Sequence, residues 1–224
     1  MKYYFIVPAA GLGKRMGLDV PKQYHKIRSK PVFIRTLEVI DNCPLVDGIY
    51  ISVNEDDKRL AEKYINDYNI KKIKKMVIGG SERQYSIYNA LCEIDEKDSV
   101  ISVQDGVRPN IREDYIGKPY EILVKDKNLD GIVVGIYEKD TIKIINEEGF
   151  IVDTPVRNTL FAAHTPQVFK GEVLRRAYDK AMQDKFLGTD DSSLVERIGG
   201  RIKIFEGFTD NIKITTKEDL KFFE

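Results

Sequence analysis

Short apolar runs alternate with amphipathic stretches along almost the whole chain of 224 residues. The apolar runs predict buried strands at residues 3–7, 49–53, 75–78, 100–103, 131–136 and 201–205. Apolar positions at helical spacing predict helices over 31–41, 56–68, 82–93, 113–125 and 171–182. This alternation predicts an α/β, Rossmann-like fold: a mostly parallel twisted sheet with helices on both faces.

Residues 137–158 break the alternation. Two short apolar stretches flank the turn sequence Asn146–Gly149, which predicts a β-hairpin. It offers little apolar surface to bury against its own domain, and a lone hairpin is marginally stable. We therefore expect a single domain over 1–224 with 137–158 as a dimerisation arm in a two-fold homodimer. A hairpin folded onto the edge of its own domain is the alternative.

The composition bounds the function. The 36 basic and 36 acidic residues cancel, so no global charge attracts nucleic acid or an anionic membrane surface. Two separated cysteines and two separated histidines argue against a disulfide framework and a zinc site. No apolar run reaches membrane-spanning length, and the start of the chain resembles a strand and not a signal peptide. We expect a cytoplasmic protein without nucleic-acid or membrane partners.

Residues 7–17, VPAAGLGKRMG, follow the first predicted strand, and Pro21-Lys22-Gln23 comes shortly after. Small residues let the backbone close around an anion, and Lys14, Arg15 and Lys22 bring positive charge to it, which suits a nucleotide triphosphate. No Ser or Thr follows Gly13-Lys14, so this is not a P-loop. A dinucleotide fingerprint lacks its third glycine and its acidic residue. An ordinary strand-to-helix turn with surface cations remains open.

Topology supports a site at this loop, because ligands of α/β sheets bind beyond the carboxyl ends of the strands. The loop follows the first strand, and Asp105 follows the strand at 100–103. Two capping boxes are also predicted, Ser81 with Gln84 and Thr216 with Asp219.

Further motifs follow in order: GGSER at 79–83, QDGVRP at 104–109, TPQVF at 165–169, TDDSS at 189–193 and NIKIT at 211–215. Together with the opening loop they resemble the methylerythritol-phosphate cytidylyltransferase family of isoprenoid biosynthesis. The ribitol-phosphate cytidylyltransferases are its near relatives. The resemblance runs from residue 3 to about 220.

The resemblance implies that a polyol phosphate attacks the α-phosphorus of CTP and that pyrophosphate leaves. A phosphate monoester has a second pKa of about 6, so it needs no general base. Positioning and positive charge would carry the catalysis. Mg²⁺ would be held mainly by the CTP phosphates, as this ion prefers few protein ligands.

The family motifs also imply residue roles. The catalytic cations would be Arg15, Lys22, Lys213 and Arg157. The nucleotide would be bound at Ala9, Ala10, Gly11, Gly13, Gly80, Ser81, Ser86 and Gly106. The acceptor would be bound at Asp105, Arg108, Thr165 and Thr189 and, from the partner's arm, at Thr141 and Arg157.

Other interpretations stay open at single residues. Lys14 is a solvated lysine or a minor phosphate ligand, and Lys213 is a phosphate ligand or an ordinary strand-edge lysine. Asp105 is a magnesium-associated ligand or an ion-pair partner of Arg108, and we favour a role near the metal.

Other functions are weighed against this one. A nicotinamide oxidoreductase lacks its fingerprint, and a non-catalytic nucleotide-binding protein would tend to lose Lys22, Asp105 or Lys213. Among acceptors, the motifs at 8–11 and 189–193 favour methylerythritol phosphate. Those at 106–109 and 155–158 lean toward ribitol phosphate. We choose methylerythritol phosphate.

Overall fold

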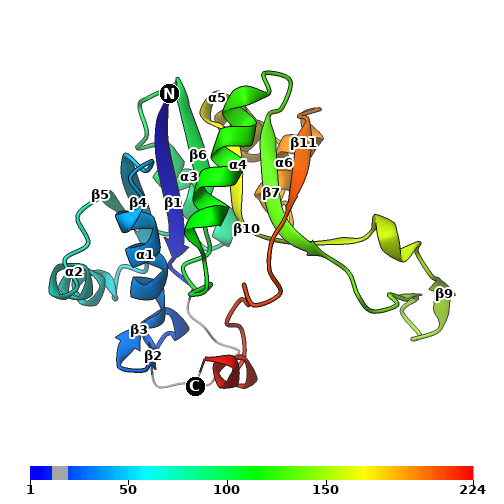
Figure 1. Cartoon of the computed structure of the whole chain (residues 1–224), viewed down its shortest axis with the longest axis horizontal. Helices are drawn as coiled ribbons and strands as arrows, with labels where there is room; N and C mark the ends of the chain where they lie inside the picture. Colours follow the sequence, from blue (N-terminus) through cyan, green and yellow to red (C-terminus); the bar gives the residue numbers. More distant parts are fainter. Residues whose placement is uncertain (12–19, 224) are drawn as a thin grey trace.

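A seven-stranded sheet forms the centre of the protein (Figure 1). The computed structural model describes residues 1–11 and 20–223. The strand order is β11-β7-β10-β6-β1-β4-β5, and β10 alone among these strands runs antiparallel to its neighbours. The bounds are β1 Lys2–Ala9, β4 Gly48–Val53, β5 Ile73–Ile78, β6 Ser99–Val103, β7 Gly131–Tyr137, β10 Phe161–Lys170 and β11 Ile202–Glu206. The predicted mostly parallel, Rossmann-like sheet is confirmed.

Helices cover both faces of the sheet because successive side chains of a strand point to opposite faces. In β1, Phe5 and Val7 belong to the core under α1, α2 and α4, whereas Ile6 belongs to the core under α3, α5 and α6. All three side chains are fully buried. The bounds are α1 Val32–Asn42, α2 Lys58–Asp67, α3 Arg83–Leu91, α4 Glu113–Lys125, α5 Gly171–Gln183 and α6 Asp191–Arg197.

Among the main strands and helices, two were not predicted, β10 and α6. Pro166 lies inside β10, and the pairing of β10 with β7 shifts register between Ala163 and Gln167. A proline cannot donate to the strand ladder, so it interrupts the pattern by which a strand is recognised. Helix α6 is short and begins with a capping box, in which the Asp190 carboxylate accepts from the Ser193 amide.

The capping boxes expected elsewhere differ. The residue before α3 is Glu82, which makes no side-chain cap, so the box assigned to Ser81 is wrong. Asp219 does accept hydrogen bonds from the backbone amides of Thr215 and Thr216. No α-helix follows, however: Asp219 lies within the 3-10 helix η4 (Glu218–Phe222), which has no side-chain cap at Lys217.

The segment at 137–158 projects away from the sheet (Figure 1). It carries the paired strands β8 (Ile144–Ile145) and β9 (Ile151–Asp153), and the 3-10 helix η3 (Arg157–Thr159) begins at its end. The hairpin is therefore confirmed, and it does not fold back onto its own domain. Its apolar content was underestimated, because Phe150 is 66% exposed and Val156 is 67% exposed.

Three small elements sit beside the carboxyl end of β1, namely η2 (Lys22–Tyr24), β2 (Lys26–Ile27) and β3 (Lys30–Pro31). Phe223, directly after the C-terminal turn η4, joins a small apolar cluster with Ile27 and Ile214. No helix in the described part of the chain is long and apolar enough to span a membrane.

Candidate active site

A cleft of about 680 Å³ opens at the carboxyl ends of the parallel strands. It brings together segments from five of the sequence motifs, as the predicted topology requires. Its lining is Pro8, Ala9, Ala10, Gly11, Lys22, Gln23, Asn54, Gly80, Ser81, Glu82, Arg83, Ser86, Asp105, Val107, Lys213 and Thr215.

Lys22 is set at the edge of the cleft by its neighbour in η2. The side chain of Gln23 is buried, and its Nε2 donates to the backbone oxygen of Ala9 at 2.9 Å. This bond fastens η2 to the end of β1. A long lysine side chain thereby starts from a fixed backbone next to the glycine loop.

The loop after β5 forms a second wall. The hydroxyl of Ser86 accepts from the Gly80 amide at 3.0 Å and donates to the Glu82 oxygen at 3.1 Å. At Gly79, a Cβ atom would lie 2.3 Å from the Cβ of Ala10. Glycine therefore lets this loop approach the β1 loop closely, while Ser86 holds the loop in shape.

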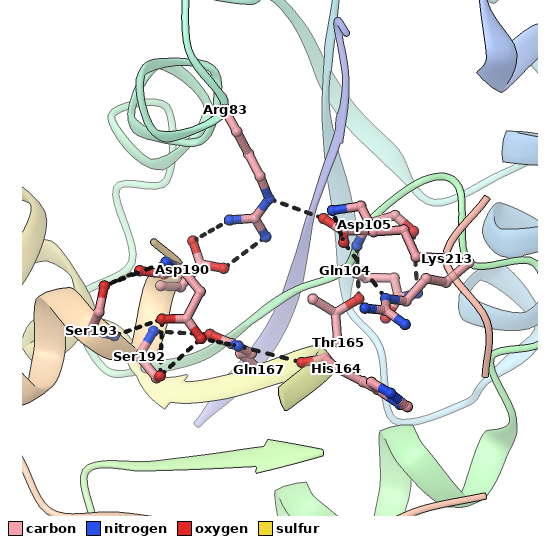
Figure 2. A network of polar contacts seen from close by, with 12 residues as sticks. Arg83, Gln104, Asp105, His164, Thr165, Gln167, Asp190, Ser192, Ser193 and Lys213 are labelled. Carbon is pink, nitrogen blue, oxygen red and sulfur yellow. Dashed lines mark hydrogen bonds and ion pairs between the residues drawn. The ribbon is translucent and has the colours of Figure 1, made fainter. Parts of the chain in front are cut away.

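Asp105 is the centre of a buried ion-pair cluster (Figure 2). Its Oδ1 accepts from Arg83 Nε at 3.0 Å, and its Oδ2 lies 2.8 Å from Lys213 Nζ. Arg108 Nε is 3.6 Å from the same Oδ2. Burial alone would raise the pKa of Asp105, but Arg83, Lys213 and Arg108 together hold it far below its usual value. The carboxylate is therefore ionised throughout the physiological range.

Lys213 reaches this cluster because its segment is clamped from both sides. Ile214 is fully buried, and its amide donates to the Val107 oxygen at 2.9 Å. Arg108 donates from Nη1 to the Asn211 oxygen at 2.6 Å, and Asn211 donates to the Thr165 oxygen at 2.9 Å. The predicted acceptor-side residues Arg108 and Thr165 thus pack behind Asp105 and brace it.

A second carboxylate completes the network. Asp191 is fully buried and accepts hydrogen bonds from both terminal nitrogens of Arg83, Nη1 at 3.2 Å and Nη2 at 2.8 Å. The hydroxyl of Tyr178 also donates to it, at 2.5 Å. Burial and the adjacent Asp191 raise the pKa of that hydroxyl well above its ordinary value, so it stays protonated as a donor. Thr189 lies in the exposed loop just before this point.

Comparison with known proteins identifies the family. A family model described as 2-C-methyl-D-erythritol 4-phosphate cytidylyltransferase matches residues 3–224. A protein of that name from Fusobacterium nucleatum is 46% identical over all of this chain and 96% of its own length. One from Geobacter metallireducens is 41% identical over all of this chain and 97% of its own length.

The chain belongs to this cytidylyltransferase family. Solved structures agree. The 4-diphosphocytidyl-2C-methyl-D-erythritol synthase of Anaerococcus prevotii has a TM-score of 0.86 and 29% identity, over 99% of this chain and 93% of its own. The 2-C-methyl-D-erythritol 4-phosphate cytidylyltransferase of Francisella tularensis has a TM-score of 0.81 and 31% identity, over 99% and 98%.

Most residues expected from the family motifs meet at the cleft. Ala9, Ala10, Gly11, Lys22, Gly80, Ser81, Ser86, Asp105 and Lys213 line it. Gly106 lies behind it, where its amide donates to the Pro8 oxygen at 3.4 Å. Gly13, Lys14 and Arg15 fall outside the described residues.

The arm residues stand apart from the cleft of their own chain. Thr141 and Arg157 are exposed on the projecting segment, and Arg157 donates to the Lys139 oxygen at 3.2 Å. Neither belongs to the cleft lining found among residues 1–11 and 20–223. They can serve an active site only if that site belongs to another subunit.

The side chains around Asp105 bear on the expected Mg²⁺. No group of three or more acidic, His or Cys side chains able to hold a metal occurs among the described residues. Both oxygens of Asp105 already face cations, which would repel Mg²⁺. Asp105 is therefore an ion-pair partner, the second of its two interpretations, and its surroundings do not fit a bound Mg²⁺.

Sequence reasoning missed the partners that hold the site together. Arg83 and Asp191 lie inside quoted motifs, yet neither was assigned a role. Gln23 also lies in a quoted motif, and its hydrogen bond to Ala9 was not foreseen. The signal was available for Asp191, since a buried carboxylate requires a cationic partner.

Proposed function

We propose that the protein transfers the cytidylyl group of CTP to 2-C-methyl-D-erythritol 4-phosphate, releasing pyrophosphate. A phosphate oxygen of the acceptor forms a bond to the α-phosphorus. The bond from that phosphorus to the bridging oxygen of the β-phosphate breaks, and the electron pair leaves with pyrophosphate. The product is the CDP-polyol, an isoprenoid precursor in the family's pathway.

One observation carries the proposal: Lys22, Lys213 and the Gly80 loop line the same cleft. A glycine-walled slot suits a flat base, and two lysines from opposite ends of the sequence suit the charged phosphates. Since the acceptor phosphate is already an anion, the chemistry asks for fixed positive charge and not for a base. Arg15 is proposed to add a further cation from the glycine loop.

The nucleotide and the acceptor then divide the site. We assign the triphosphate to Lys22 and the amides at 9–11, and the α-phosphate to Lys213. The acceptor hydroxyls are assigned to the side of Asp105 and Thr189. The buried ion pairs keep Lys213 in place before the substrates bind, which is the preorganisation that charge stabilisation requires.

We further propose a homodimer in which the arm of one subunit completes the active site of the other. The arm exposes Ile145, Phe150, Ile151 and Val156, each about 60% or more. Exposed apolar side chains on a two-stranded hairpin favour burial against a partner. Arg157 of the partner subunit would clamp the acceptor phosphate, since its planar fork binds phosphate oxygens in pairs.

Mg²⁺ is proposed to enter with CTP and to be held by the phosphates, supplying charge neutralisation there. The reaction is assigned to the cytoplasm, since Cys43 and Cys92 are both free thiols, as in a reducing compartment.

The test is a pyrophosphate-release assay with CTP, Mg²⁺ and a panel of polyol phosphates. We expect the highest kcat/KM with methylerythritol phosphate. One methyl branch is worth about 1–3 kcal/mol in a pocket, so a clear margin over ribitol phosphate is expected. A tenfold preference for ribitol phosphate would overturn the acceptor and leave the reaction class intact.

A further inference from the structure

Arg83 uses its guanidinium to join two carboxylates, those of Asp105 and Asp191. Figure 2 shows Arg83 reaching toward Asp105. It is the first residue of α3, directly after the loop that forms the base-side wall. Three of its five N–H donors are spent on Asp105 and Asp191. The fork geometry fixes both carboxylates in orientation as well as in position.

The bond to Asp105 reaches the catalytic cation. Arg83 holds Oδ1 of Asp105, and Oδ2 of the same group holds Lys213 at 2.8 Å. Because the two oxygens of a carboxylate are rigidly related, fixing one sets the direction of the other. Lys213 is 35% exposed and has no other ion-pair partner among the residues that the structure describes. Its ammonium therefore points where Asp105 directs it.

The bond to Asp191 reaches the acceptor side. Asp191 is the first residue of α6, whose start is fixed by the Asp190 capping box. Gln167 Nε2 donates to Asp190 at 2.7 Å, and the Ser192 amide donates to Gln167 at 2.9 Å. The loop carrying Thr189 leads directly into this network. Arg83 thus ties the base-side helix, the Lys213 anchor and the acceptor loop together.

We propose that Arg83 is a positioning residue for the transfer reaction, acting on Lys213 through Asp105 and on the Thr189 loop through Asp191. This inference rests on the proposed function, in which Lys213 binds the α-phosphate. Arg83 lines the cleft, but its donors face the two carboxylates and leave the substrate phosphates to Lys22 and Lys213.

The experiment compares Arg83→Met, Lys213→Met and the double variant, with CTP and methylerythritol phosphate as substrates. Arg83→Met is expected to lower kcat about fiftyfold and to change the KM for CTP less than about threefold. In the Lys213→Met background, Arg83→Met is expected to lower kcat less than about fivefold, because the effects of two residues that act through one another do not add.

Arg175→Met is the matched control. Arg175 is another partly buried arginine with local bonds, donating to the Leu91 and Ile94 oxygens from α5. It should lower the melting temperature and leave kcat within twofold. Arg83→Met strands the buried Asp191 charge, so Arg83→Met with Asp191→Asn is made in parallel as a variant that retains the fold. It should show the same loss in kcat.

The outcomes separate cleanly. If Arg83→Met lowers kcat by the same factor in the wild-type and Lys213→Met backgrounds, Arg83 does not act through Lys213 and the inference is overturned. A large rise in KM for CTP would instead make Arg83 a direct nucleotide ligand and overturn it too. If the wild-type protein fails to release pyrophosphate from these substrates, the proposed function fails, whatever Arg83 does.

Discussion

Replacing Lys213 with methionine separates catalysis from stability at this site. Methionine keeps the apolar stem of the side chain and removes the ammonium that lies 2.8 Å from Asp105. We expect a large loss of turnover and a small change in the melting temperature. The two effects have different origins in the structure.

The catalytic loss follows from removing one preorganised cation. Deleting a single charge-stabilising donor typically costs about 2.7–4 kcal/mol, which lowers kcat about a hundredfold or more. The loss of stability is smaller because Arg83 and Arg108 still face Asp105 after the change. Lys213 is also 35% exposed, so its pair is worth about 1 kcal/mol at most. For a chain of this size, that shifts the melting temperature by about 2–4 °C.

The assay is pyrophosphate release under saturating CTP, alongside thermal unfolding of the same samples. Lys170→Met is the control. Lys170 is also partly buried and pairs with Asp130 at 3.9 Å, but it is the last residue of β10 and does not line the cleft. That variant should keep its turnover. If Lys213→Met retained more than a third of wild-type kcat, Lys213 would be an ordinary surface lysine and the assignment would be wrong.

Three further outcomes are expected. CTP should be strongly preferred over UTP and GTP, and equal turnover of CTP and UTP would refute the base pocket. Gly79→Ala should lower kcat/KM for CTP at least about tenfold, because the new Cβ would lie 2.3 Å from the Cβ of Ala10. Mixing inactive Arg157→Ala and Lys22→Ala chains should restore part of the activity, and no rescue after demonstrated subunit exchange would contradict the shared site. Burial and the nearby Arg108 lower the pKa of His164 to about 4, so stability should be complete above about pH 6.5 and should fall by about 2 kcal/mol at most as the pH drops toward 4. Urea unfolding of His164→Gln at pH 7 and pH 4.5 should lack that loss, and parallel losses in both proteins would rule the histidine out.

The strands were predictable where their hydrophobic pattern is continuous. Residues of β1 and β6 are apolar on both faces, as a strand between two helical layers must be. Strand β10 could not be recognised the same way, because His164, Pro166 and Gln167 interrupt its apolar pattern. Of these three residues, Gln167 supports the site, because it bonds Asp190 and the Ser192 amide at the start of α6. At that position the local pattern gives way to a tertiary contact.

The site was predictable as a set of motifs and not as a set of contacts. Position along the chain places Asp105 and the glycine loop on one edge of the sheet, because both follow parallel strands. The pairing of Arg83 with Asp191 spans 108 positions, and no local pattern encodes it. It depends on how α3 and α6 pack on the same face of the sheet. Only three-dimensional packing could supply it.

The charges of this cluster explain why acids stand inside a site for anions. Arg83, Arg108 and Lys213 carry three positive charges, and Asp105 and Asp191 carry two negative charges, which leaves one net positive charge. Three unpaired cations this close would repel one another and destabilise the fold before substrate arrived. With the acids present, the Lys213 ammonium is paired with the Asp105 carboxylate. In the proposed reaction it would exchange that carboxylate for a phosphate oxygen, one anionic partner for another. The chain has no net charge to attract CTP from a distance. The positive charge that the cluster offers is therefore local, and the buried acids Asp105 and Asp191 hold it in place.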